Sequence, residues 1–128
     1  MTPEQQRIVI AEACGWKCHV VPLHDADGLI TELKTMLRWV APNEVLKVNP
    51  YWNCYACPDY LNDLNAMHEA EKLILNYDAG SHGRYIDHLI DVCGKRKDET
   101  WHLAIFHATA AQRAEAFLRT LNLWTHET

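Results

Sequence analysis

The clearest pattern of apolar and polar positions lies near the end of the chain. Apolar residues recur there at helical spacing and form one stripe, made of Ala110, Ala114, Phe117, Leu118 and Leu121. Thr109 precedes this stripe and Gln112 follows three residues later, which is the arrangement of a capping box. The pattern therefore predicts a helix over 110–121.

The first segment repeats the same start signal. Thr2 can cap a helix, Pro3 suits its first position, and Gln5 completes a capping box. Gly15 is a natural left-handed stop for this helix. Residues 16–21 then alternate between apolar and polar positions before Pro22, so we expect a short strand there.

The next segment, over 28–40, shows an apolar stripe at helical spacing, with Asp27 available as its cap. The stripe consists of Leu29, Ile30, Leu33, Met36, Leu37 and Val40. We predict an amphipathic helix. The stretch 42–58 contains three prolines, which favours a strand fragment over 44–48 followed by an irregular loop.

A long helix is predicted from Asp59 to about Asn76, closed by the turn at 78–80. Its expected buried side comprises Leu61, Leu64, Met67, His68, Ile74 and Leu75. The segment 84–93 fits a helical stripe but also alternates like a strand. We favour a helix, because Gly94 and the basic residues after it suit a helix C-terminus. Residues 101–106 fit a strand.

These elements predict an α+β fold. The chain has 128 residues, of which 48% are hydrophobic and 23% charged, as in an ordinary globular protein. This length suits one domain, since a chain of this size can bury about two-thirds of its surface without covalent cross-links. We therefore expect a single compact domain over 1–128, with four or more helices packed on a small β-sheet.

The charge narrows the expected partners. A formal charge of -5 disfavours direct nucleic-acid binding, because the field would repel phosphates. No apolar run approaches the roughly 20 residues of a membrane span, so we expect no membrane partner and a cytoplasmic location. We also expect the five cysteines to be reduced, since a core of this size needs no disulfide framework.

Metal and catalytic chemistry have weak sequence signals. Cys54 and Cys57 have the spacing of a zinc half-site, to which Cys14, Cys18, His19 and His24 could add ligands. No second pair of cysteines matches it, so ordinary packed thiols are the preferred interpretation. His88, His102 and His107 have no nucleophile or carboxylate partner readable in the sequence. We therefore predict no metal, no cofactor, no catalytic residues and no enzymatic activity.

Four islands of sequence carry a family resemblance. They are residues 10–16, residues 58–72, Tyr85 with Leu89, and residues 108–121 with Trp124. Together they resemble small bacteriophage and prophage proteins related to the phage ABA sandwich domain. The resemblance implies a viral origin, a small α+β fold with helices packed on a small sheet, and a dispensable role in the infected host. It carries over no catalytic residues.

With no catalytic signature, we expect a non-enzymatic, phage-encoded accessory protein that binds and inhibits or modulates a host protein, such as a defence component. The expected binding surface combines exposed aromatic residues of the proline-rich loop with carboxylates at the start of the long helix. Its residues are Tyr51, Trp52, Tyr55, Asp59 and Asp63. The carboxylates also have an ordinary interpretation as helix caps.

A second function stays open. The protein could sequester a small anionic molecule, such as a nucleotide signal, if arginines gather around a pocket. The candidates for that role are Arg84, Arg113 and Arg119. The sequence also leaves the formation of a homo-oligomer open.

Overall fold

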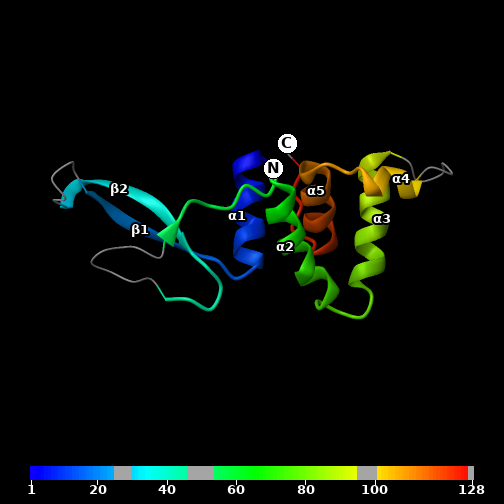
Figure 1. Cartoon of the computed structure of the whole chain (residues 1–128), viewed down its shortest axis with the longest axis horizontal. Helices are drawn as coiled ribbons and strands as arrows, with labels where there is room; N and C mark the ends of the chain where they lie inside the picture. Colours follow the sequence, from blue (N-terminus) through cyan, green and yellow to red (C-terminus); the bar gives the residue numbers. More distant parts are fainter. Residues whose placement is uncertain (25–29, 46–53, 95–100, 127–128) are drawn as a thin grey trace. The chain divides into compact units, whose positions relative to one another are not determined.

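A computed structural model describes residues 1–24, 30–45, 54–94 and 101–126, without side-chain placement at 21–24, 30–35, 54 and 101 (Figure 1). Its elements are α1 (Pro3–Ala13), β1 (Lys17–His24), β2 (Ile30–Val40), β3 (Cys54–Tyr55), α2 (Leu64–Leu75), α3 (Ser81–Cys93), α4 (Trp101–Phe106) and α5 (Ala110–Thr120). The described residues thus contain five helices and a small antiparallel sheet, which confirms an α+β fold.

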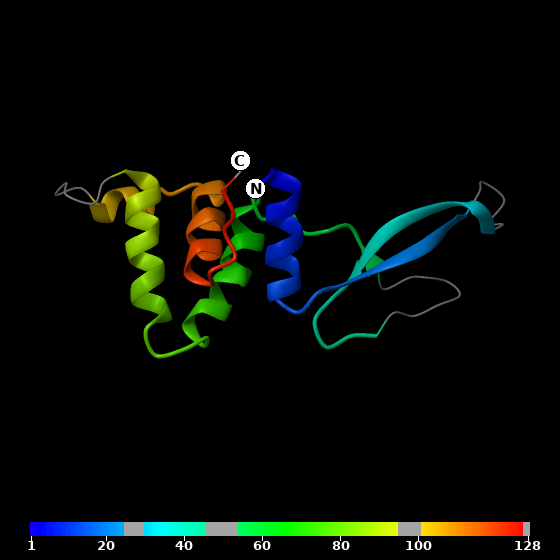
Figure 2. The same ribbon diagram turned by 180° about the vertical axis from the view of Figure 1, so that it is seen from behind.

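The chain forms two compact units. The helical unit consists of Met1–Ile10 and Pro58–Thr128, and the hairpin unit is Ala11–Cys57. In the helical unit, α5 lies beside α2 and α3 (Figures 1 and 2). The largest fully buried side chains of this unit include Ile10, Met67, Ile74, Leu89, Phe117 and Leu118.

The predicted helix at 110–121 is confirmed as α5. The Thr109 hydroxyl accepts a hydrogen bond from the Gln112 backbone N–H (3.1 Å), and the Gln112 side chain accepts one from the Thr109 N–H (2.9 Å). Thr2 and Gln5 form the same reciprocal pair at the start of α1. Both predicted capping boxes are therefore present, and each satisfies two backbone donors that the helix leaves free.

The helix α2 begins later than the sequence pattern indicates. Asp63, rather than Asp59, is its N-cap, and accepts bonds from the backbone N–H groups of Asn65 and Ala66. Asp59 is instead part of a preceding turn, in which its carbonyl accepts the Asp63 N–H. The predicted buried side is right for Met67 and Ile74, and wrong for Leu64, His68 and Leu75, which are exposed.

The favoured helix at 84–93 is confirmed as α3, which ends at Gly94 in the left-handed conformation (φ 73°). The predicted strand at 101–106 is wrong, because these residues form α4. A lone strand at this position would need a partner for its backbone groups. In a helix those groups bond internally, and the carbonyl of Ile105 near the end of α4 accepts a hydrogen bond from the Arg113 side chain.

The largest difference between the predicted and the observed secondary structure lies in the hairpin unit. The predicted strand at 16–21 is confirmed within β1, but the predicted helix at 28–40 is β2, which pairs antiparallel with β1 from Lys17↔Val40 to His24↔Ile30. Cross-strand pairing outweighs the helical stripe, since β1 needs a partner and β2 carries β-branched residues suited to a sheet. The register shifts between Pro22 and Leu23.

The structure describes only part of the proline-rich stretch 42–58. Glu44 and Val45 are outside any strand, contrary to the predicted fragment at 44–48, whose remaining residues lie outside the described ones. The short β3 pairs with the end of β2 through Trp39↔Tyr55 and Val40↔Cys54. This pairing fixes the backbone of Tyr55 at one end of the hairpin.

Candidate ligand-binding pocket

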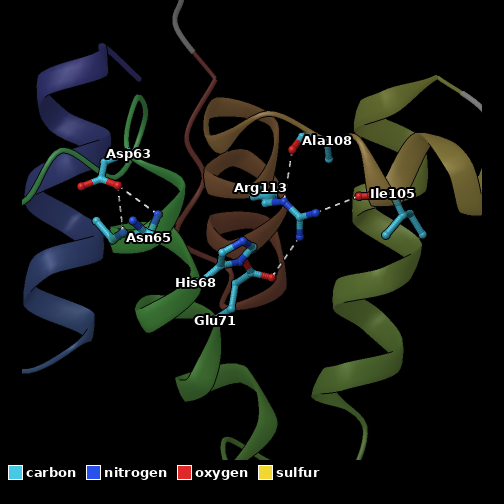
Figure 3. Close-up of polar contacts among 8 residues, drawn as sticks. Asp63, Asn65, His68, Glu71, Ile105, Ala108 and Arg113 are labelled. Carbon is cyan, nitrogen blue, oxygen red and sulfur yellow. Dashed lines mark hydrogen bonds and ion pairs between the residues drawn. The ribbon is translucent and has the colours of Figure 1, made fainter.

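The most developed polar site of the helical unit centres on Arg113, in the first turn of α5 (Figure 3). Its guanidinium donates to the carbonyls of Ala108 (Nε, 3.2 Å) and Ile105 (Nη2, 2.8 Å). Its Nη1 donates to Oε2 of Glu71 at 3.3 Å. The Arg113 side chain is 12% exposed. The charge is therefore held by α2, by α5 and by the end of α4, largely out of water.

Glu71 connects this arginine to a histidine. It lies on α2, where residues three apart share a face, so His68 reaches it with Nδ1 at 2.8 Å from Oε1. Each carboxylate oxygen of Glu71 thus has its own partner. Its side chain is 18% exposed, so the Arg113–Glu71 pair is largely shielded from solvent screening.

Tyr85 on α3 completes this cluster. It is 4% exposed, and its buried hydroxyl lies near Glu71 and Arg113 without making a hydrogen bond of normal geometry in the structure described. Burial raises the pKa of this phenol strongly, and the negative charge of Glu71 raises it further. The hydroxyl therefore stays protonated and is a hydrogen-bond donor at any working pH.

These groups line a pocket of about 180 Å³ formed by α2, α3, α4 and α5. His68, Lys72 and His82 add polar side chains to its wall. The rest of the lining is apolar, from Ile74, Leu75, Ile86, Leu89 and Ile105. An apolar cavity with a few converging polar groups is the usual form of a small-ligand site.

The three arginines singled out from the sequence have different surroundings. Arg113 lines the pocket, whereas Arg84 and Arg119 are not among its lining residues. Arg84 pairs with Asp78 at 2.8 Å on the surface. Arg119 pairs with Glu115 and lies 5.5 Å from the centre of the Trp124 ring. The structure therefore brings one of the three to the pocket.

The two carboxylates of the predicted surface have structural partners. Asp63 is the N-cap of α2, so its ordinary interpretation as a cap is confirmed. Asp59 accepts from the amide of Asn62 and lies 3.6 Å from Arg7. Both residues are nonetheless exposed. Of the three aromatic residues predicted with them, Tyr55 is exposed, and Tyr51 and Trp52 lie outside the described residues.

The cysteines and histidines form no metal site in the described ranges. There, no three side chains of histidine, cysteine, aspartate or glutamate gather closely enough to hold a metal ion. Cys14, Cys18, Cys57 and Cys93 form no disulfide bond in the described part, and the Cys54 side chain lies outside it.

Glu71, Tyr85 and His68 were missed as site residues from the sequence. A signal for the ion pair does exist. Glu71 lies four residues after Met67 on α2, and Arg113 lies four residues before Phe117 on α5, so each charge falls beside a buried apolar stripe. Opposite charges at core-facing positions of two helices indicate that they pair. The sequence does not say that these two helices are neighbours.

Comparisons with family models, curated proteins and solved structures find no match to this chain. Among the helices of the described segments, none combines the length and hydropathy needed to cross a membrane.

Proposed function

We propose that the protein is a non-enzymatic accessory protein of phage origin that binds a host protein, such as a defence or regulatory component. The observation that supports this proposal best is an exposed apolar face on the hairpin unit. We call it the hairpin face and define it as Cys18, Val20, Leu37 and Tyr55.

The register of the strands places these four residues together. Val20 is directly opposite Leu37, Cys18 is opposite Trp39, and Trp39 is opposite Tyr55. Trp39 therefore lies on the same face but is itself buried, so the face is exposed around it and not throughout. Opposed residues share a face of a sheet, and so do residues two apart along a strand. Val20 is 66% exposed, Leu37 57% and Tyr55 51%.

The opposite side of the same hairpin is more polar. Lys17, His19 and Arg38 alternate with the apolar residues and therefore lie on the other face. An exposed face with adjacent aliphatic and aromatic side chains is typical of a protein-binding surface. Tyr55, one of the predicted binding residues, is part of it.

The charge of -5 suits a basic host target, such as a protein that handles nucleic acid. Opposite net charges accelerate encounter, and an acidic protein can compete for a surface that otherwise binds phosphates.

The test is affinity purification of the tagged protein from phage-infected host cells, followed by binding measurements with the purified host protein. We expect V20S/L37S to raise the Kd at least tenfold and to increase the dissociation rate. The matched control is F106S, which removes an even more exposed apolar side chain from α4. Binding unchanged in V20S/L37S would refute the role of the hairpin face.

A second candidate is capture of a small anionic molecule, favoured by the place of Arg113 in the pocket. The pocket is smaller than the roughly 300–1,000 Å³ of most ligand sites, so a nucleotide could insert only one part of itself. Replacing Asp59 by lysine, which keeps the Asp63 cap of α2, separates the two functions. It should slow association with a basic protein, and leave binding of an anion unchanged or strengthened.

A further inference from the structure

The pocket of the helical unit carries an inference of its own, independent of the hairpin face. The pocket is open to solvent on one side, and its volume of about 180 Å³ is large enough for a single ring, since a cavity of about 150 Å³ can hold benzene. The apolar part of its wall comes from side chains of α2, α3 and α4, with Ile74, Ile86 and Ile105 among them. Size and lining together fit a compact ligand with one ring.

The charges in the pocket are already compensated. Arg113 pairs with Glu71, and Glu71 also holds His68. An anionic ligand would have to take Arg113 from Glu71, which would leave a poorly exposed carboxylate without its cation. A cationic ligand would similarly compete with Arg113 for Glu71. A neutral ligand leaves the pair intact.

Hydrogen-bond donors, in contrast, remain in excess. Arg113 has five N–H groups and makes three hydrogen bonds, and the Tyr85 hydroxyl makes none in the structure described. Buried donors without an acceptor are unfavourable, so an acceptor on a bound molecule would stabilise them.

We propose that this pocket binds a compact, neutral molecule with one ring and a carbonyl or amide oxygen. Its ring occupies the apolar wall, and its oxygen accepts from the Tyr85 hydroxyl. The site goes beyond the proposed host-protein binding, and its ligand differs in charge from the anion considered above.

The test uses three probes of nearly equal shape with the full chain, followed by NMR of the ¹⁵N-labelled protein. Benzamide is neutral with an acceptor, benzoate is anionic, and toluene has no acceptor. We expect saturable benzamide binding with a Kd of about 1–10 mM, as usual for a ligand of this size. Benzoate should bind at least about tenfold more weakly, because it competes with Glu71. Toluene should bind about three- to tenfold more weakly than benzamide.

Two variants locate the binding. Y85F removes the hydroxyl and keeps the ring, so it should raise the Kd of benzamide about three- to tenfold and leave that of toluene unchanged. I86W fills the pocket and should abolish binding of all three probes. Y77F is the matched control, since Tyr77 is exposed and outside the lining.

Three outcomes would overturn the proposal. Tighter binding of benzoate than of benzamide would mark an anion site. Benzamide binding that is equal in wild type, Y85F and I86W would place the ligand elsewhere. The absence of saturable benzamide binding at about 50 mM would show that the pocket does not take a ligand of this class. If I86W fails to fold, the effect of Y85F on benzamide binding still tests whether the ligand lies in this pocket.

Discussion

At the scale of single residues, the Arg113–Glu71 pair is the strongest candidate for a polar interaction that stabilises the helical unit. It joins α5 to α2, and both side chains are largely shielded from water. Removing one member of such a pair leaves the other charge poorly solvated, which costs more than the loss of a surface pair.

We therefore expect E71Q to lower the free energy of unfolding by about 1–3 kcal/mol, because Arg113 loses its compensating charge. The control is E69Q, two residues away on the exposed side of α2, where Glu69 pairs with Lys72. It should change stability by less than about 0.5 kcal/mol. Urea denaturation measures both. Equal effects of the two variants would show that the buried pair is no stronger than a surface pair.

Asp78 should make stability depend on pH. The hydrogen bond from Arg84, followed by the one from the Gly80 N–H, holds the pKa of this carboxyl below its usual range. Its stabilising effect is therefore complete above the carboxyl pKa of the unfolded chain, about 4, and is lost as the pH falls through the lower folded value. The stability gap between wild type and D78N should be largest near pH 7 and shrink below about pH 4. A gap independent of pH would contradict this linkage.

At the scale of elements, helix ends are defined by single side chains. T109A should destabilise the protein by about 1 kcal/mol, since the Gln112 N–H loses its acceptor. T109S keeps the hydroxyl and is the control, with a loss of at most a few tenths of a kcal/mol. Thermal or urea unfolding of both variants would test the capping box, and indistinguishable midpoints would argue against it.

The end of α1 depends on Gly15, whose φ of 95° disfavours any residue with a Cβ atom. We expect G15A to destabilise by about 1 kcal/mol. G83A is the opposite control, because Gly83 is within α3 and an added Cβ there meets no atom within 4 Å. It should stabilise by up to about 1 kcal/mol. The same sign in both variants would be inconsistent with the backbone argument.

The sequence predicts helices well where a local cap and an apolar stripe agree, as at Thr109 and in α5. The prediction fails where pairing with a segment distant in the sequence determines the secondary structure. The stripe over 28–40 is locally helical, but β1 offers a strand to pair with, and only the Asp27–Gly28 dipeptide between the two apolar runs hints at a hairpin. The pocket could not be predicted for the same reason, since it needs α2, α3 and α5 brought together.

At the scale of the whole molecule, most of the buried apolar side chains that the structure describes lie in the helical unit. Ala11, Trp39 and Val40 are the buried hydrophobic residues of the hairpin unit in the described part, whereas the helical unit contributes side chains from α2, α3 and α5 together. Local stability follows the density of buried contacts.

Hydrogen exchange should therefore differ between the units. We expect amides in α5 to exchange at least about tenfold more slowly than those of paired residues in β1 and β2, after correction for intrinsic rates. Mass spectrometry of peptides from each element would measure this. Uniform protection across both units would mean that they unfold together.

The helical unit is built from two stretches of chain that flank the hairpin unit. The amino group of Met1 donates to the carbonyl of Thr125 at 2.9 Å, and Arg7 lies 3.6 Å from Asp59. During synthesis, residues 1–10 are thus made before the hairpin unit, and they reach Asp59 and Thr125 only after residues 11–57 have been made. Individual helices form within microseconds, but closing such long loops is slow. The rate at which this unit is completed therefore depends on long-range closure rather than on helix formation.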